Sequence, residues 1–310
     1  TIRGRDVEIA QEGVLGGVID ASGQNVSITT TAGGIGTQEA PLVIEAARAL
    51  TLTSAEDIWV RGGAGNLLLE NVIAQGSVSL EADGELAAFE GQHSRVTSAT
   101  GEIALRASEI RSMELVGAAG QKLTASIAAA QAELYVDHDA DVSLLLNGGI
   151  LSGELRADGE LYIEEMAEAS MLQMIATLEA KDVTVRVPGT LTMGGGVTVA
   201  GGSVQLAGAG AHAEIAVKAG SYDTVTAGTA GGDYTLHLTG GSIGTLHCAG
   251  QTAAKSVTIA VTGGSVTRLA AADNCVTDAL GIVLRGGSVG AVSLGGETAA
   301  VTLELGTAKV

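Results

Sequence analysis

The sequence predicts an all-β fold, a right-handed parallel β-helix in which the chain coils repeatedly around a narrow aliphatic core. Three observations lead to this prediction: few aromatic residues, many glycines with almost no proline, and an internal repeat of about 23 residues. Compact globular cores use large aromatic side chains, yet aromatic residues make up 2% of these 310 residues while hydrophobic residues make up 46%. The apolar content is therefore mostly Ala, Val, Leu and Ile, which suits a thin stacked core.

Glycine marks the turns of this chain. It contains 46 glycines and 2 prolines, and it lacks the triplet period of collagen. Short runs rich in β-branched residues and leucine separate the glycines, a pattern typical of many short strands joined by tight bends.

The C-terminal third contains the clearest internal repeat. Leu238–Leu246 (LTGGSIGTL) recurs at an equal spacing as Val261–Leu269 and then as Leu284–Val292. Looser copies lie upstream, at Val217–Val225 and Gly201–Val204. A repeat of this length is typical of one solenoid coil.

Apolar residues alternate ahead of each Gly-Gly pair, which indicates strands with one buried face. Because equivalent positions recur once per repeat, one coil per repeat would stack Leu236, Ile259 and Ile282 in one column of the core. Glycine has no Cβ, so each Gly-Gly pair would let the backbone bend sharply at a corner.

Residues 164–180 favour a helix by intrinsic propensity, since they are rich in Glu, Met, Ala and Leu. The same stretch matches an earlier part of the chain that contains Gly62, Gly63 and Gly65. We therefore expect strand and turn in this segment.

Residues 1–310 are predicted to form a single elongated β-helix with two parts of different chemistry. Residues 1–200 repeat irregularly and hold 28 of the 35 acidic residues, so this part is distinctly acidic, whereas residues 201–310 carry the regular Gly-Gly-Ser repeats. With roughly 18–23 residues per coil, the chain would form about 14 coils.

The net charge of −19 argues against nucleic acid or an anionic membrane as a partner, because both would repel the chain. No apolar run approaches the length of a membrane span, and the first residues lack the hydrophobic region of a signal peptide. We expect no membrane insertion and interpret the chain as an internal fragment.

Several blocks between Gly34 and Ala82 resemble the filamentous-haemagglutinin-like large repetitive adhesins. They are Gly34–Thr37, Pro41–Ile44, Leu50–Thr53, Asp57–Val60 and Gly76–Ala82. The family pattern usually has Asn before Pro-Leu, where this chain has Ala40. The Gly-Gly-Ser copies likewise look like tandem segments of giant surface proteins from Gram-positive gut bacteria. The resemblance implies an extracellular β-helix stalk at a bacterial cell surface, and it brings no catalytic residue.

The preferred function is structural: a non-catalytic segment of a secreted surface protein that spaces or displays binding regions. Its expected partners are flanking domains, further copies joined end to end, or a host or cell-surface glycan or protein. Two alternatives stay open, a polysaccharide lyase or hydrolase of β-helix fold and a trimeric phage tail-spike or fibre segment. Charged residues make up 16% of the chain and are dispersed among the repeats, which favours the structural function over an enzyme. No cofactor is expected.

Asp137, Asp139 and Asp141 are the candidate metal ligands. A strand would place the three carboxylates on one face, and Asp-x-Asp-x-Asp also opens a calcium loop. Val142 and Gly148, however, stand where an EF-hand loop has glycine and a carboxylate. These three residues are therefore either a calcium site or an acidic strand edge exposed to solvent. The five histidines show no spacing typical of a metal site.

Trp59, Tyr135 and Tyr162 each follow an acidic and an aliphatic residue and precede another aliphatic one. Strand alternation then points their rings outward, where they could contact a ligand. Aromatic residues beside solenoid corners are the alternative explanation.

Cys248 and Cys275 are separated along the chain by one coil plus four residues. Adjacent coils would bring them near each other, so we expect a disulfide in a secreted protein. Two buried thiols are the alternative.

Overall fold

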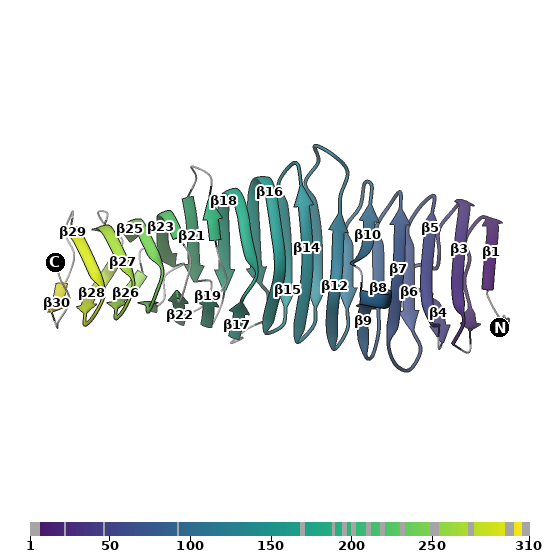
Figure 1. Cartoon of the computed structure of the whole chain (residues 1–310), viewed down its shortest axis with the longest axis horizontal. Coiled ribbons are helices and arrows are strands. Elements are labelled where there is room, and N and C mark those ends of the chain that lie inside the picture. Colours follow the sequence, from purple (N-terminus) through teal and green to yellow (C-terminus); the bar gives the residue numbers. More distant parts are fainter. Residues whose placement is uncertain are drawn as a thin grey trace. The chain divides into compact units, whose positions relative to one another are not determined.

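The computed structural model describes thirty β-strands and one short 3₁₀ turn, Phe89–Gly91 (Figure 1). The described residues are 7–305, without residues 22, 46, 92, 168–170, 188–189, 194–196, 200–202, 209–211, 218–220, 230–232, 249–253, 272–275 and 295–300. In this part of the chain, no helix is long and apolar enough to span a membrane. The predicted all-β, parallel β-solenoid fold is confirmed.

The chain divides into two compact units, residues 1–147 with 152–155, and residues 148–151 with 156–310. The first unit contains β1 (Val7–Glu12), β2 (Val18–Asp20), β3 (Asn25–Ala32), β4 (Leu42–Glu45), β5 (Ala49–Ser54), β6 (Ile58–Gly62), β7 (Leu67–Ala74), β8 (Val78–Glu81), β9 (Glu85–Ala88), β10 (Ser94–Ser98), β11 (Ile103–Arg106), β12 (Glu109–Val116), β13 (Leu123–Ala128), β14 (Gln131–His138) and β15 (Val142–Asn147).

Parallel strands in the first unit stack in columns, because each coil repeats the strand and turn order of the coil before it. One column runs β1–β3–β5–β7–β10–β12–β14 and a second runs β2–β4–β6–β8–β11–β13–β15. A third, short column is formed by β9 between the first halves of β7 and β12. Parallel pairing of each strand with its equivalent in the next coil is the topology of a β-solenoid.

β16 (Ile150–Glu165) contributes residues to both units. The second unit also contains β17 (Met171–Met174), β18 (Thr177–Val187), β19 (Thr190–Met193), β20 (Val197–Val199), β21 (Ser203–Gly208), β22 (His212–Val217), β23 (Ser221–Thr229), β24 (Asp233–Leu238), β25 (Ser242–Cys248), β26 (Ala254–Val261), β27 (Ser265–Ala271), β28 (Val276–Leu284), β29 (Ser288–Leu294) and β30 (Val301–Leu305). Its columns run β17–β19–β22–β24–β26–β28–β30 and β18–β21–β23–β25–β27–β29.

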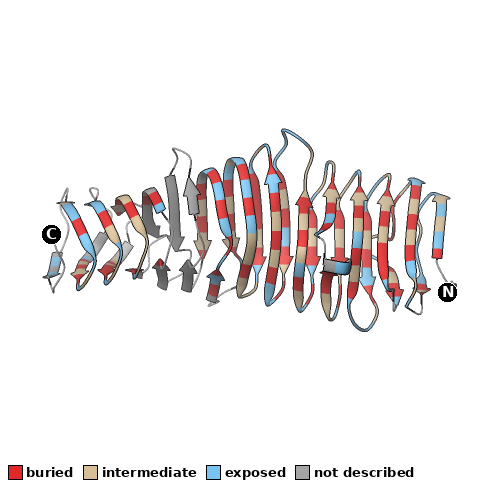
Figure 2. Cartoon of the chain, viewed as in Figure 1, coloured by how far each residue is buried: buried red, intermediate tan, exposed pale blue. Residues whose placement is uncertain are grey.

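Buried and less buried residues alternate along the strands, as Figure 2 shows. In the first unit, register places one apolar residue of each coil over that of the next, in the column Ile28, Leu52, Val72, Val96 and Leu115. All five are 0% exposed. Aliphatic stacking of this kind removes apolar area from water on both sides of every coil.

The predicted core column of the second unit is confirmed. Leu236 pairs in register with Ile259, and Ile259 pairs with Ile282. All three side chains are 0% exposed. The described residues of the segment 164–180 are strand and turn, as expected, with the strands in β16, β17 and β18, so stacking on neighbouring coils outweighs the helix propensity of this segment.

The Gly-Gly corners have a steric explanation. Gly264 and Gly287 have φ values of +71° and +68°, a region that L side chains rarely adopt. A Cβ on Gly264 would lie 2.5 Å from the carbonyl oxygen of Gly241 in the preceding coil, and one on Gly263 would collide with the carbonyl oxygen of Thr239. Both glycines of the pair are therefore required by the close approach of stacked backbones.

Among the described residues, the number of parallel stacked coils differs slightly from the predicted 14. Several coils between Val187 and Ser221, and others near the C-terminal end, include residues outside the described part of the chain. Two expectations stay predictions: that the chain is a single elongated domain, and that an acidic, irregular part gives way to regular Gly-Gly-Ser repeats near residue 200.

We predict that Ile259→Ala will lower the free energy of unfolding by about 3 kcal/mol, because it leaves a cavity in a column without exposed members. Urea denaturation followed by circular dichroism measures the loss. Val283→Ala, on the outward face of β28, is the matched control and should cost less than about 1 kcal/mol. Equal losses for the two variants would contradict the inward placement of Ile259.

We further predict that Gly264→Ala will destabilise the second unit by more than about 2 kcal/mol, because the Cβ meets backbone and the φ angle is unfavourable. Gly281→Ala is the control, since a Cβ there would have as its nearest neighbour a threonine side-chain oxygen at an ordinary 3.5 Å. Thermal denaturation should separate the two variants clearly. A Gly264→Ala protein as stable as the wild type would exclude the close corner contact.

Candidate functional site

The three aromatic side chains predicted to face outward occupy outward strand positions. Trp59 on β6, Tyr135 on β14 and Tyr162 on β16 are each half-buried between two buried neighbours. They do not form a row along one column, because Trp59 pairs with Ser79 and Tyr135 pairs with Glu114. Ligand contact by these rings stays a prediction.

Trp59 lines a hollow of about 250 Å³ in the first unit. The segment 36–39 forms one wall, and the segment 56–57, directly before β6, forms another. Val14, which is 55% exposed, contributes an apolar surface. Polar side chains complete the lining: Thr37, Gln38, Glu39, Glu56 and Asp57.

A second hollow, of about 360 Å³, adjoins the first because Glu56 and Asp57 line both. It extends over the next two coils, where Gln75, Gly76 and Thr100 contribute to it. Together the two hollows offer apolar, amide and carboxylate groups along the coil-stacking direction.

Hydrogen bonds fix the segment between the hollows. The buried hydroxyl of Ser54 accepts from the backbone N–H of Glu56 at 3.2 Å and donates to the carbonyl of Asp57 at 3.2 Å. Asp57 Oδ1 accepts from the backbone N–H of Ser77 in the next coil at 2.7 Å. Gly76 leaves the room that the Asp57 carboxylate occupies, since a Cβ there would collide with Oδ1.

Tyr135 belongs to a separate polar cluster on the first unit. Its hydroxyl donates to Glu133 Oε1 at 2.7 Å, and its ring lies 3.7 Å from the His93 ring, centroid to centroid. The hydrogen bond to Glu133, with burial and nearby negative charge, raises the pKa of Tyr135 to about 12. Glu133 Oε2 also accepts from the backbone N–H and the hydroxyl of Ser112, whose φ of +55° marks the bulge in β12.

Arg111 gathers carboxylates beside this cluster. Its guanidinium lies 2.8 Å from Glu109 and 2.9 Å from Glu85. The hydrogen bond from Arg111 lowers the pKa of Glu109, and the hydrogen bond from Tyr135 lowers the pKa of Glu133. These two acids are therefore held in their charged form near neutral pH.

Tyr162 lies in a simpler setting on the second unit. Burial is the main cause that raises its pKa, and the hydrogen bond that it donates to Glu164 Oε2 at 2.7 Å adds to the effect. Arg186 pairs with the same carboxylate at 3.5 Å. The Tyr162 hydroxyl is therefore already bonded to the Glu164 carboxylate, which in turn pairs with Arg186.

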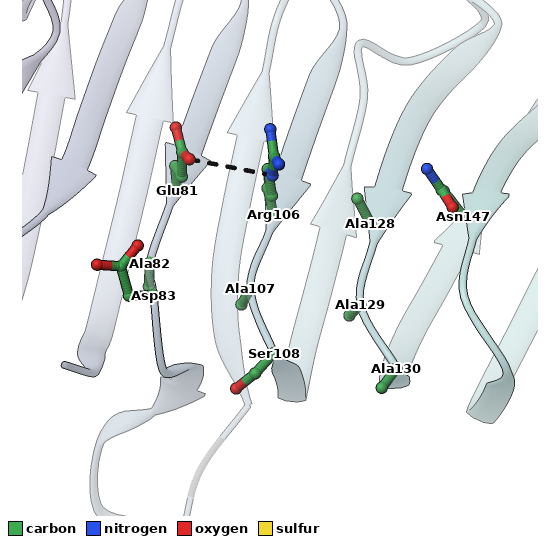
Figure 3. A pocket seen from close by; sticks show the side chains of 10 residues that line it. All are labelled: Glu81, Ala82, Asp83, Arg106, Ala107, Ser108, Ala128, Ala129, Ala130 and Asn147. Atoms are coloured by element: carbon green, nitrogen blue, oxygen red, sulfur yellow. Dashed lines mark ion pairs between the residues drawn. The ribbon is translucent and has the colours of Figure 1, made fainter. Parts of the chain in front are cut away.

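The largest of the described hollows, about 550 Å³, lies at the carboxyl ends of β8, β11, β13 and β15 (Figure 3). Alanines 82, 107, 129 and 130 form much of its floor, and Glu81 and Arg106, 3.9 Å apart, stand at its edge. Ala82, Ala107 and Ala129 are buried under the corner. Asp83, Ser108 and Asn147 supply its other polar groups, and no aromatic side chain lines it.

The predicted calcium ligands lie at the end of β14 and in the turn that follows. Asp137, Asp139 and Asp141 are all exposed, and only Asp137 lies within the strand. Asp139 Oδ1 accepts from the backbone N–H of Gly120 in the preceding coil at 2.8 Å. Over the described residues, no three His, Cys, Asp or Glu side chains gather closely enough to hold a metal ion. Calcium binding stays a prediction.

His138 is a buried residue that the sequence did not single out. Its side chain is 5% exposed, and Nε2 lies 2.6 Å from the carbonyl oxygen of Gln121. Gly117 provides the space beside the ring, because a Cβ there would lie 3.2 Å from His138 Cε1. A glycine about one coil before a histidine in the sequence was the signal that could have predicted room for a buried His138 ring.

Cys248 is buried at the end of β25, where it pairs in register with Ala271 of β27. Cys275 lies four positions further along the chain than Ala271 and outside the described residues. The disulfide between them stays a prediction.

Comparison with known proteins does not identify a relative. No family model, no curated protein and no solved structure matches this chain. The resemblance to haemagglutinin-like adhesins is therefore supported only in its architecture, the β-solenoid.

Sequence reasoning found Trp59 but missed the polar residues around it. Gln38 and Glu39 precede Pro41 in a segment where apolar and polar residues do not alternate, so the sequence could not show which way their side chains point. It also missed the ion pairs between coils, although Arg95 with Glu114 and Arg285 with Glu304 share one sequence separation. Opposite charges at the coil spacing were the signal that could have found them.

We predict that Glu133→Gln will lower the stability of the first unit at pH 7 by roughly 1 kcal/mol, a value reduced for solvent screening of a partly exposed carboxylate. Because the folded pKa of Glu133 is lowered, its contribution is present above the unfolded pKa near 4.3 and is lost as pH falls through the folded pKa. The difference between wild type and variant should therefore disappear in acid.

Urea denaturation at a series of pH values between 7 and 3 measures this difference. Glu102→Gln is the control, since Glu102 is exposed and its side chain makes no described hydrogen bond or ion pair. A Glu133→Gln penalty that is the same at pH 3 and pH 7 would show that charge on Glu133 does not matter.

Proposed function

We propose that this chain is a non-catalytic structural segment of a secreted bacterial surface protein, where it spaces or displays binding regions of the same polypeptide. The observation that carries the proposal is how the outward charges are used: arginines and carboxylates pair with each other from coil to coil. The β-solenoid fold suits such a segment, since each coil covers its neighbour and stability accumulates along the stack.

The pairs recur on both units. Those between neighbouring coils with the shortest distances are Arg95–Glu114 at 2.9 Å, Arg111–Glu85 at 2.9 Å and Arg285–Glu304 at 2.7 Å. Longer pairs include Arg106–Glu81, Arg156–Glu179 and Arg186–Glu164. Each exposed pair contributes little to stability on its own, because solvent screens the attraction between the charges. No single pair carries the argument. Ion pairs of the same kind recur from coil to coil, and this repetition supports a scaffold in which the outer faces of successive coils have similar chemistry.

The acids of the densest cluster also support a non-catalytic role. Glycoside hydrolysis needs one carboxylic acid with a raised pKa that can protonate the leaving oxygen. Glu109 and Glu133 have lowered pKa values, and Arg111 and Tyr135 occupy their oxygens. These residues are arranged to hold charge, which is the arrangement of a structural network.

The bacterial surface location and the partners follow from the resemblance and the acidic charge. A chain with net charge −19 stays soluble outside the cell and is repelled by anionic polymers. We propose flanking domains of the same polypeptide, further copies joined end to end, or a host or cell-surface glycan or protein as its partners.

We predict no turnover when the protein is incubated with neutral and acidic polysaccharides, with and without calcium. Reducing-end release and absorbance of unsaturated uronates measure hydrolysis and elimination respectively. Turnover that Asp139→Asn abolishes would overturn the structural function in favour of an enzyme. A stable trimer in sedimentation equilibrium would instead favour the tail-spike alternative.

A further inference from the structure

We propose that the two adjoining hollows beside Trp59 form a saccharide-binding site that prefers neutral or amino sugars over anionic ones. The proposal rests on the proposed function and deepens it, since it gives the segment a ligand of its own without catalysis. It concerns only the first unit, around β6 and the segments before it (Figure 1).

The lining has the two kinds of group that sugars require. A sugar ring has an apolar C–H face, which stacks on an aromatic ring, and hydroxyls at its edge, which need donors and acceptors. Trp59 and the exposed Val14 offer the apolar surface. Gln38 and Glu39 offer an amide and a carboxylate beside them.

Several of these polar groups are available to a ligand. The structure describes no side-chain hydrogen bond or ion pair for Gln38, Glu39, Glu56 or Gln75. This contrasts with the Tyr135 cluster, where neighbouring side chains already occupy the carboxylates. Polar groups without protein partners, on a wall that includes an aromatic ring, are what a binding site presents before its ligand arrives.

The size of the hollows suits a short saccharide. The Trp59 hollow, at about 250 Å³, lies just below the roughly 300–1,000 Å³ of pockets that hold drug-sized ligands, so it accommodates about one ring. The second hollow continues past Glu56 and Asp57 to Gln75. A second sugar ring of the same saccharide would lie in this hollow, where the Gln75 amide would meet its hydroxyls.

Charge sets the preference among sugars. Glu39, Glu56 and Asp57 line the Trp59 hollow, and it has no basic side chain among its lining residues. Sulfated sugars and uronates would be repelled, whereas an ammonium group would be attracted to the carboxylates and to the indole face.

The site is organised before a ligand binds, which lowers the cost of binding. Ser54 fixes the backbone of Glu56 and Asp57, and the Ser77 N–H fixes the Asp57 carboxylate. Gly36, with φ +68°, lies so close to the backbone of Trp59 that no other residue fits, and this contact sets the wall opposite β6.

The experiment uses the full chain and its single tryptophan, so tryptophan fluorescence reports on this site alone. Chitosan, chitin and heparin hexasaccharides are titrated at about 150 mM salt, which screens general attraction to the acidic surface. We expect the first two to shift the Trp59 emission and heparin to leave it unchanged. Isothermal titration calorimetry gives the affinities.

Variants separate a built site from general attraction. Trp59→Ala should weaken both chitin and chitosan by about tenfold or more, and Trp59→Phe should retain part of the affinity. Glu56→Gln should weaken chitosan by about fivefold and chitin less. Glu102→Gln, an exposed carboxylate two coils further on, is the matched control and should bind as the wild type.

The results that would contradict the saccharide site differ from those that would contradict the non-catalytic function. Absence of binding to all three sugars, or chitosan binding that Trp59→Ala and Glu56→Gln leave unchanged in folded protein, would overturn the site. A Trp59-dependent affinity combined with sugar cleavage would support the site and overturn the non-catalytic function.

Discussion

Direct stacking of each coil on the next is the constraint on which the rest of this structure depends. Parallel strands hold one register, so every side chain lies over the residue that occupies the same place one coil earlier. Core positions then become columns of aliphatic residues, such as Leu236, Ile259 and Ile282. Corners become places where backbones nearly touch, and Gly264 over Gly241 shows that only glycine fits there.

The regular part of this arrangement could be predicted from sequence because it leaves a fixed spacing. Equally spaced copies predicted which residues of β24, β26 and β28 share a column, and the Gly-Gly pairs predicted the corners. Comparison with another coil also overruled the helix propensity of residues 164–180. These successes share one cause: each depends on a comparison of one coil with another.

The irregular coils of the first unit leave no such spacing. Val7 pairs with Val26 and Val26 pairs with Leu50, so the second of these coils is longer than the first, because turns of different length join strands of constant register. The sequence could place Trp59 on an outward face but could not show which turns surround it. The hollow arises from segments of two coils that differ in length, and only their three-dimensional placement brings Gln38 and Glu56 to the same hollow.

Acidic charge imposes a second constraint on stacked coils. Carboxylates at equivalent positions would face one another at the strand spacing, about 4.8 Å, and would repel. Arginines inserted between them relieve this repulsion, as Arg111 does for Glu85 and Glu109. Where the carboxylates lie on turns, as Glu39 and Glu56 do, no arginine lines the hollow with them.

The contrast between strands and turns explains where a solenoid can bind a ligand. A strand residue is fixed by the coils on both sides, so a change on one strand affects its neighbours in the column. A turn can lengthen without disturbing the register of the strands that it joins, as the longer coil between Val26 and Leu50 shows. Trp59 lies on the first outward position of β6, where the rigid column holds the ring, and the longer turn between β3 and β4 in the preceding coil supplies polar groups beside it. Rigidity from the strand and chemistry from the turn are together what a binding site requires.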